Sequence, residues 1–246
     1  MRSTRIYTPQ PLKRGANIQL ETNAAQHLTR VLRMRPGDQF VLFDGSGVEF
    51  NATIEQCDTQ RVVIEVQAER LRESPPRLRI HLGMAISRGE RMDWIMQKST
   101  ELGVTAITPL LTERTQVKLS SKRVAKKLSH WRQITISACE QSGRCLLPDL
   151  DAPMPLRNWL PLVDTERRLL LHPSATEDET TLDLASVPGS VSLLIGPEGG
   201  FSATELATAR AQGFHALKLG PRVLRTETAP LAAIAFAQTL WGDMRP

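Results

Sequence analysis

The sequence predicts a small β domain followed by an α/β domain with a largely parallel sheet. Before residue 75, short runs alternate apolar and polar side chains, which is typical of half-buried strands. After it, apolar strand-like runs alternate with segments of helical periodicity. Pro75 and Pro76 lie between the two patterns and favour an extended linker. Two domains fit the 246 residues, and we place them at 1–74 and 75–246.

The N-terminal part is expected to hold three strands and one helix. Strands are predicted at 40–43, 48–54 and 61–66, and a turn cluster at 44–47 joins the first two into a hairpin. A helix is predicted at 24–32, because His27, Leu28, Val31 and Leu32 recur at helical spacing.

The second part alternates strands with helices in the order that a parallel sheet requires. We expect strands at 78–86, 106–111, 169–171, 191–195 and 216–219. We expect helices at 91–102, 121–141, 202–212 and 228–240. Gly103 supplies a stop for the first helix, and Ser202 with Glu205 forms a capping box for the third.

Composition excludes several classes of protein. With 41% hydrophobic and 23% charged residues, the chain is not disordered, collagen-like or coiled coil. No apolar run approaches the roughly 18 residues of a membrane span, and the first residues lack a secretory core. The three cysteines include no Cys-x-x-Cys pair, which argues against a disulfide framework or a zinc site. We expect a cytoplasmic protein without a membrane partner.

The positive charge is concentrated in the middle of the chain. The net charge is +5, but residues 75–150 alone hold 13 basic and 6 acidic side chains, a net +7. A localised basic surface attracts phosphate backbones, so RNA or DNA is a reasonable partner, and a merely solvated surface is the open alternative. Aromatic residues are only 4%, which disfavours a base-stacking sheet.

Three predicted strand ends carry loops of unusual composition. They are His172-Pro173 after Leu171, residues 196–200 after Ile195, and residues 220–227 after Leu219. Ligands of open α/β sheets bind beyond the carboxyl ends of the strands, and glycine lets the backbone approach them closely. The loops therefore predict a small-molecule site, with tight strand–helix turns as the alternative.

Other ligand and catalytic motifs are absent from the sequence. There is no Gly-x-Gly-x-x-Gly dinucleotide turn, no phosphate-binding P-loop and no Gly-x-Ser-x-Gly nucleophile elbow. The five histidines show no metal-ligand spacing, so we expect no metal, and only His172 at a strand end is a candidate site residue.

Several segments, taken together and in order, resemble the RsmE family. The segments are 27–33 with Gly37-Asp38, 88–94, 97–98, 101–104, 140–144, 194–202 and 219–229. The resemblance covers nearly the whole chain. The two most specific segments are Leu194-Ile195-Gly196-Pro197-Glu198-Gly199-Gly200-Phe201-Ser202 and Leu219-Gly220-Pro221-Arg222-Val223-Leu224-Arg225-Thr226-Glu227-Thr228-Ala229.

The resemblance implies both a fold and an activity. It implies a SPOUT-type methyltransferase domain with a trefoil knot, preceded by a PUA-like β-barrel that binds RNA. It implies a homodimer that uses S-adenosylmethionine to methylate N3 of one uridine in 16S ribosomal RNA, within small ribosomal subunit particles.

In such folds the three loops form the knot and hold the cofactor. The residues expected to bind S-adenosylmethionine here are Leu171, His172, Ile195, Gly196, Pro197, Glu198, Gly199, Gly200, Leu219, Gly220, Arg222, Val223, Leu224, Thr226 and Ala229.

The chemistry of the transfer suggests catalytic candidates. Uridine N3 carries a weakly acidic proton, so a base, or a cation that stabilises the uridine anion, is required. We predict Arg225 as the cation, with Glu227 or Glu140 as the base or an orienting group. N3 lies on the pairing edge, so the base must be presented unpaired or flipped.

The basic residues predict where RNA binds. Those expected to contact it are Arg30, Arg33, Arg35, Arg88, Arg91, Lys122, Arg123, Lys126, Lys127 and Arg144.

Three alternative functions stay open at this point. They are a non-catalytic rRNA-binding module, a SPOUT methyltransferase acting on another RNA, and a doubly wound nucleotide-dependent oxidoreductase.

Overall fold

The structure, a computed structural model, describes residues 4–58, 61–117, 121–173 and 186–244, and these form two compact units. The N-terminal unit comprises residues 1–75 and 136–147, and the C-terminal unit comprises 76–135 and 148–246. The change of unit after Pro75 lies one residue from the expected boundary. The grouping of 136–147 with the N-terminal unit is a feature that the expected division, at one point in the chain, did not include.

The N-terminal unit is built on a five-stranded mixed sheet in the order β1-β3-β4-β5-β2. Its strands are β1 (Arg5–Tyr7), β2 (Asn17–Gln19), β3 (Gln39–Phe43), β4 (Val48–Cys57) and β5 (Val62–Arg72). The predicted hairpin is present, because β3 and β4 pair antiparallel around the turn after Phe43. Alternate side chains of these strands, including Phe40, Leu42 and Ile54, form the core of this unit.

The helix expected at 24–32 is found at 22–31 and changes type within that range. Helix α1 (Thr22–Gln26) gives way to a π-helical turn, η1 (His27–Val31), in which the Leu32 N–H donates to the His27 carbonyl at 3.0 Å. The wider turn leaves Leu28 in the core but Val31 67% exposed. Leu32 is also exposed, at 38%, so the expected apolar stripe through Val31 and Leu32 is wrong. Arg33 follows with φ +55°, in the left-handed region.

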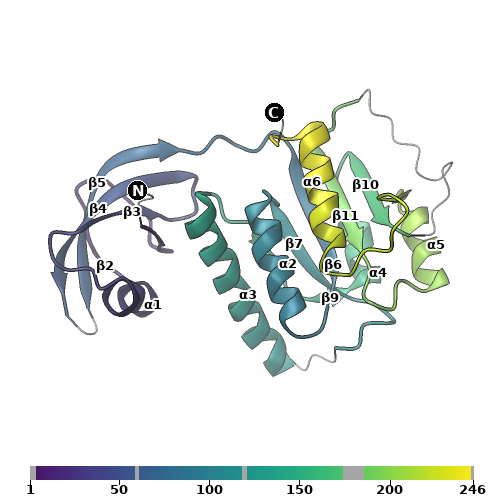
Figure 1. Cartoon of the computed structure of the whole chain (residues 1–246), viewed down its shortest axis with the longest axis horizontal. Helices are drawn as coiled ribbons and strands as arrows, with labels where there is room; N and C mark the ends of the chain where they lie inside the picture. The colour runs from purple at the N-terminus through teal and green to yellow at the C-terminus, as the bar shows by residue number, and fades with distance from the viewer. Residues whose placement is uncertain (1–3, 59–60, 118–120, 174–185, 245–246) are drawn as a thin grey trace. The chain divides into compact units, whose positions relative to one another are not determined.

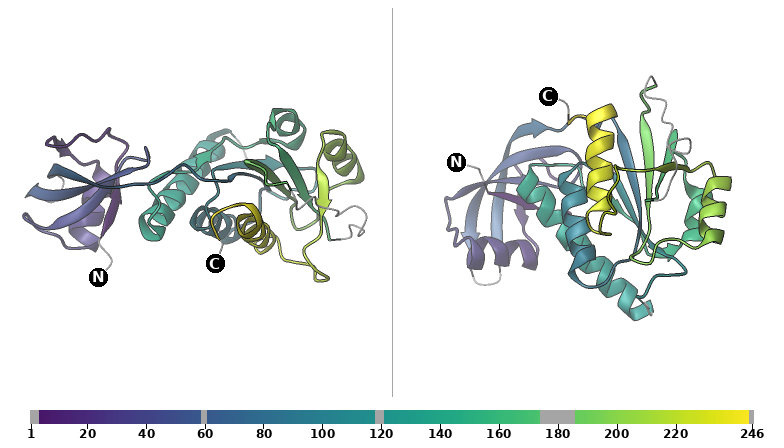
Figure 2. Two further views of the ribbon diagram at one scale, coloured as in Figure 1. Left: turned by 90° about the horizontal axis from the view of Figure 1, so that it is seen from above. Right: turned by 45° about the vertical axis from the view of Figure 1, so that its right-hand side comes forward.

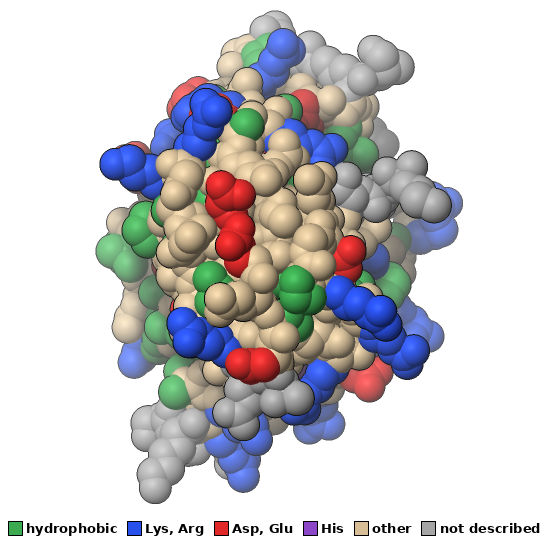
Figure 3. Space-filling view, turned by 90° about the vertical axis from the view of Figure 1, so that its left-hand side faces the viewer, with side chains coloured by type: hydrophobic (Ala, Val, Ile, Leu, Met, Phe, Trp, Pro, Cys, Tyr) green, Lys and Arg blue, Asp and Glu red, His purple; other side chains and the backbone are tan. Residues whose placement is uncertain are grey.

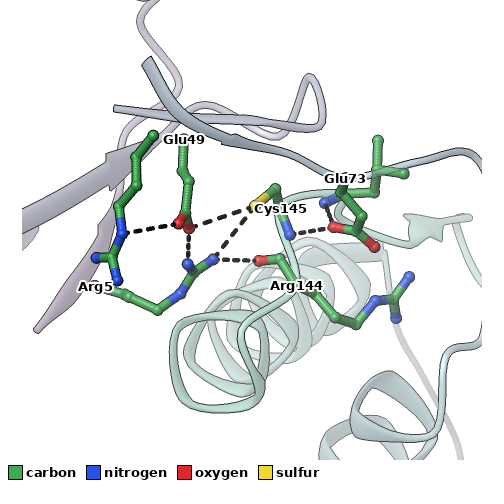
Figure 4. A network of polar contacts seen from close by, with 7 residues as sticks. Arg5, Glu49, Glu73, Arg144 and Cys145 are labelled. Atoms are coloured by element: carbon green, nitrogen blue, oxygen red, sulfur yellow. Dashed lines mark hydrogen bonds and ion pairs between the residues drawn. The ribbon is translucent and has the colours of Figure 1, made fainter. Parts of the chain in front are cut away.

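A buried polar network joins segments of the N-terminal unit that lie far apart in the sequence (Figure 4). The Arg5 guanidinium pairs with the Glu49 carboxylate and also donates to the Arg144 carbonyl at 2.9 Å. Glu73 accepts hydrogen bonds from the backbone N–H groups of Cys145 and Leu146. These contacts explain why residues 136–147 group with the N-terminal strands.

The C-terminal unit contains the predicted parallel sheet (Figure 1). The main strands are β6 (Arg79–Ala85), β7 (Ala106–Leu111), β10 (Arg167–Leu171), β11 (Ser190–Ile195) and β12 (His215–Leu217). Two short strands, β8 (Asp149–Leu150) and β9 (Met154–Pro155), pair with β7. The order is β12-β10-β11-β6-β7-β8 and every described pair is parallel, so the α/β prediction is confirmed.

Helices cover both faces of this sheet, as Figure 2 shows edge-on. Helices α2 (Glu90–Glu101) and α6 (Ala229–Trp241) pack on one face around Ile80, Met84 and Ile195. Helix α4 (Leu156–Trp159), the 3-10 turn η2 (Leu160–Leu162) and helix α5 (Ala203–Ala211) pack on the other, around Leu110 and Leu194. The capping box predicted for α5 is present, with Ser202 and Glu205 bonding each other's backbone N–H groups.

Helix α3 (Ser121–Ser142) belongs to both units, with residues up to 135 in the C-terminal unit and the rest in the N-terminal unit.

Of the three free cysteines, Cys57 is half-buried, while Cys139 and Cys145 are buried. Burial raises the pKa of the Cys139 thiol to about 11, which keeps it protonated at neutral pH. Within the residues placed by the structure, no helix is both long and apolar enough to cross a membrane.

Candidate functional site

The three glycine- and proline-bearing loops meet in one cavity of the C-terminal unit. They follow β10, β11 and β12, and β10 pairs with both of the others, so their carboxyl ends are neighbours. The cavity has a volume of about 350 Å³, within the range of small-molecule sites. Every residue expected to bind the cofactor lines it: Leu171, His172, Ile195, Gly196, Pro197, Glu198, Gly199, Gly200, Leu219, Gly220, Arg222, Val223, Leu224, Thr226 and Ala229.

Five further residues line the cavity that were not among those expected to bind the cofactor. They are Arg114, Pro173, Phe201, Leu217 and Lys218. Four of them lie within two residues of expected positions, so a wider window around each strand end would have found them. Arg114 follows β7 and carries no glycine signal, so only the folded arrangement brings it to the cavity.

The glycines serve different purposes in the loops. A Cβ at Gly196 would lie 3.1 Å from the ring of Phe201, so this glycine makes room for a packed aromatic side chain. Gly200 and Gly220 have φ of +67° and +73°, which glycine adopts without strain. A Cβ at Gly200 would meet no described heavy atom within 4 Å, so there the absence of a side chain leaves open space.

His172 presents a buried polar atom at the cavity. Its backbone N–H donates to the Leu217 carbonyl at 3.1 Å, which joins the loop after β10 to β12. The ring Nδ1 is buried and has no hydrogen-bond partner among the described residues. An unpaired buried nitrogen is unfavourable, so it favours a ligand that supplies the missing partner.

Arg91, in the first turn of α2, joins two of the cavity loops. Its Nη1 donates to Glu198 Oε1 at 2.8 Å, and its Nε lies 3.8 Å from Glu227 Oε2. Partial burial acts to raise the pKa of Glu198. Hydrogen bonds from its own backbone N–H, the Arg91 side chain and the Arg88 backbone outweigh this, so the pKa lies below the ordinary value. We call the group Arg91, Glu198 and Glu227 the carboxylate bracket.

The catalytic candidates are not part of the cavity lining. Glu227 belongs to the carboxylate bracket, and Arg225 is exposed, with its carbonyl accepting from the N–H groups of Thr228 and Ala229. Glu140 lies in the N-terminal unit, where one carboxylate oxygen accepts the Tyr7 N–H at 3.0 Å. Burial raises its pKa, although this hydrogen bond and the nearby charges act against the shift. Arg225 and Glu227 belong to the C-terminal unit and Glu140 to the N-terminal unit, and the roles of all three stay predictions.

The residues expected to bind RNA are mostly exposed. Arg30, Arg33, Arg35, Arg88, Arg91, Arg123 and Lys126 are exposed, Lys127 and Arg144 are half-buried, and the side chain of Lys122 lies outside the described part. Lysine and arginine side chains are scattered over the face in Figure 3, with acidic side chains between them. Their role in RNA binding stays a prediction.

Among the described residues, no group of three or more His, Cys, Asp or Glu side chains is arranged to hold a metal ion.

Two family models match the chain, one for each part. Residues 73–238 match an RNA methyltransferase domain, and residues 20–67 match an RNA methyltransferase PUA domain. A ribosomal RNA small subunit methyltransferase E from Buchnera aphidicola is 36% identical over 99% of this chain and 98% of its own length. The protein of the same name from Bacillus subtilis is 31% identical over 93% of this chain and 92% of its own.

Solved structures of similar proteins share the fold. A putative methyltransferase from Legionella pneumophila, in complex with bound S-adenosylmethionine, has a TM-score of 0.94. It is 42% identical and covers 99% of this chain and all of its own. A ribosomal RNA small subunit methyltransferase E from Neisseria gonorrhoeae, bound to S-adenosylmethionine, has a TM-score of 0.89 at 40% identity, over 99% of this chain and all of its own.

These matches confirm the expected SPOUT-type parallel-sheet domain and the PUA-like domain before it. The trefoil knot that the resemblance implies stays a prediction. The RNA methyltransferase model spans most of the chain, and several full-length relatives exceed 30% identity. The chain therefore belongs to the RNA methyltransferase family that includes the ribosomal RNA small subunit methyltransferases E.

Proposed function

We propose that the protein uses S-adenosylmethionine to methylate N3 of one uridine in 16S ribosomal RNA. The observation that carries the proposal is the cavity at three adjacent strand ends, whose lining contains every residue expected to bind the cofactor. Membership of an RNA methyltransferase family supports the same activity. Full-length relatives named as small subunit ribosomal RNA methyltransferases support the choice of RNA.

The residues of the cavity fit S-adenosylmethionine. The volume of about 350 Å³ suits a ligand of nucleoside size, and backbone at Gly200 and Gly220 is open to close approach. The unpaired Nδ1 of His172 offers a hydrogen bond that a polar ligand group completes. S-adenosylmethionine supplies an activated methyl group, so the protein's task is positioning and proton removal.

The chain's own residues are proposed to perform three tasks. The loops after β10, β11 and β12 hold and orient the cofactor, and the carboxylate bracket fixes two of them against α2. Arg225 is proposed as a cation for the uridine anion, and Glu227 or Glu140 as the base or an orienting group. The exposed basic residues, Arg30, Arg33 and Arg35 among them, are proposed to hold the RNA through phosphate contacts.

The setting of the reaction is part of the proposal. The resemblance of the sequence supports a homodimer that acts on 16S rRNA within small ribosomal subunit particles, and the cysteine pattern favours the cytoplasm as its location. Light scattering tests the first part, because a monomer of 27.4 kDa with full activity contradicts the dimer.

Nucleoside analysis of 16S rRNA tests the activity. Digested rRNA from a strain that lacks the gene is compared by mass spectrometry with wild-type rRNA and with rRNA from a complemented strain. We expect 3-methyluridine to disappear without the gene and to return on complementation. Unchanged 3-methyluridine, or the loss of a different modified nucleoside, contradicts the proposal.

A further inference from the structure

The cavity carries more positive charge than its cofactor alone explains. Three cationic side chains line it, from Arg114, Lys218 and Arg222, against a single carboxylate, Glu198, which already pairs with Arg91. S-adenosylmethionine carries a positive sulfonium and a positive ammonium group but only one carboxylate. The excess of cations therefore matches an anionic second reactant, since like charges repel and RNA is a polyanion.

Arg114 reaches the cavity from outside the three loops. It follows β7, whereas the loops follow β10, β11 and β12, and β6 lies between β7 and β11. Its side chain is exposed although it lines the cavity. This combination places a cation at the solvent-facing edge of the cavity, where an RNA base has to enter.

The turn that carries Arg114 is held from two sides. The hydroxyls of Thr112 and Thr115 lie 2.8 Å apart, and the Thr112 N–H donates to the Thr115 hydroxyl at 3.0 Å. The Glu113 N–H donates to Glu205 Oε1 at 2.9 Å, and Glu205 also caps helix α5. Because the backbone is bonded on both sides, the position of Arg114 is set before a ligand binds.

The Arg114 side chain lies along the glycine loop. Its Nη1 donates to the Gly199 carbonyl at 2.8 Å. A Cβ at Gly199 would lie 3.3 Å from the Arg114 Cβ, so the absence of a side chain at Gly199 leaves space for the aliphatic part of the Arg114 side chain. A guanidinium has five N–H groups, and this bond uses one of them, so the same cation has donors to offer a ligand.

We propose that Arg114 is a further catalytic residue, which contacts a carbonyl oxygen of the target uridine and stabilises the uridine anion. This inference rests on the proposed function. The N3 proton leaves to the proposed base, Glu227 or Glu140, or to water where these carboxylates only orient the substrate, and the N3 lone pair forms a bond to the methyl carbon. The carbon–sulfur bond breaks with its electron pair going to sulfur, and the products are 3-methyluridine and S-adenosylhomocysteine. A fixed cation beside the anion lowers the barrier of this step.

Arg114→Gln tests the proposal, because glutamine keeps hydrogen-bonding capacity but removes the charge. Arg157→Gln is the matched control, since Arg157 is an exposed arginine of α4 outside the cavity lining. We expect Arg114→Gln to lower kcat about 10²- to 10³-fold, as loss of an anion-stabilising donor does. We expect its affinity for S-adenosylmethionine, measured by calorimetry, to stay within about twofold of wild type.

Substrate acidity separates the catalytic role from a structural one. RNA containing 5-fluorouridine at the target has a more acidic N3, so it depends less on a stabilising cation. We expect this RNA to restore much of the activity of Arg114→Gln and to leave the Arg157→Gln control close to wild type. Lys in place of Arg114 keeps the charge, and we expect Arg114→Lys to retain more activity than Arg114→Gln.

Binding provides a readout that does not need turnover. With S-adenosylhomocysteine present, wild type should bind 5-fluorouridine RNA more tightly as pH rises and the base ionises, and Arg114→Gln should lose this dependence. Equal binding curves for both proteins overturn the proposal. So does a large loss of S-adenosylmethionine affinity with unchanged kcat, which makes Arg114 a cofactor-positioning residue. Failure of wild type to methylate either RNA contradicts the proposed function instead.

Discussion

The cavity and the Arg5 network are two polar regions of one chain built in opposite ways. The cavity lies at three strand ends, and its lining residues other than Arg114 fall in or beside short stretches such as 195–201. The network uses side chains from Arg5, Glu49, Glu73 and Cys145, which are separated by dozens of residues. Local composition marks the first region, whereas only the completed fold assembles the second.

This difference predicts different responses to mutation. The cavity is open to ligands, so changes in its lining should alter binding more than folding. The network pairs Arg5, 11% exposed in its side chain, with Glu49, 4% exposed, so changes there leave a buried charge without a partner. We therefore expect the network to control stability and the cavity to control affinity.

The largest effect is expected from Glu49→Ala. Removing one partner of a buried ion pair costs about 3–5 kcal/mol of folding free energy, because the Arg5 guanidinium then stays buried without its counterion. Urea unfolding measures the change. Glu69→Ala is the control, since Glu69 pairs with Arg72 at the surface and should cost less than about 1 kcal/mol. Similar losses in both variants would remove the distinction between buried and exposed pairs.

Gly200→Val should separate binding from folding in the cavity. Valine at φ +67° strains the backbone by about 1–2 kcal/mol and places a side chain in the open space of the loop. We expect at least a tenfold loss of affinity for S-adenosylmethionine in a folded protein. Gly15→Val is the matched control, because Gly15 also has a positive φ, +80°, and open space around it, but lies in the N-terminal unit. Equal affinities in the two variants contradict the placement of the cofactor.

A smaller effect is expected from breaking the carboxylate bracket. Arg91→Ala leaves Glu198 and Glu227 without the cation that joins their loops, and partly exposed pairs of this kind contribute about 0.2–1 kcal/mol. We expect up to about a fivefold loss of S-adenosylmethionine affinity by calorimetry. Arg91→Lys should recover part of it. Full affinity in Arg91→Ala would show that the loops hold their arrangement without the bracket.

The smallest effect is a pH dependence of stability at Glu140. Burial raises its pKa in the folded protein above its value in the unfolded chain. The folded state therefore binds this proton more tightly, and stability falls as pH rises from the unfolded pKa through the folded one. Glu140→Gln cannot ionise, so its unfolding free energy should fall less than that of wild type between about pH 4 and 7. Parallel pH curves would argue against a raised pKa.

The parallel sheet and the cavity loops could be predicted from the sequence, because local patterns of residues encode them. Hydrophobic periodicity predicted the parallel sheet, and glycines and prolines after Leu171, Ile195 and Leu219 predicted the cavity loops. Arg225 and Glu227 lie in the predicted loop after β12, yet neither lines the cavity. Proximity in sequence does not say which way a side chain points.

Long-range contacts and unusual local geometry could not be predicted from the sequence. Arg114 lines the cavity through a contact with Gly199, 85 residues away, and Arg5 contacts Arg144, 139 residues away. The turn at His27–Val31 has helical spacing in the sequence, but its π geometry exposes Val31. Periodicity identifies a helical segment without distinguishing a regular turn from a widened one.

A crystal structure with S-adenosylhomocysteine tests the central claim most directly. We predict the ligand in the cavity of the C-terminal unit, held by backbone around Gly196, Gly200 and Leu219, with a polar group within hydrogen-bond distance of His172 Nδ1. Arg114 should keep its bond to Gly199 and remain open to solvent. Density for the ligand at another place, with this cavity filled only by water, would contradict the account.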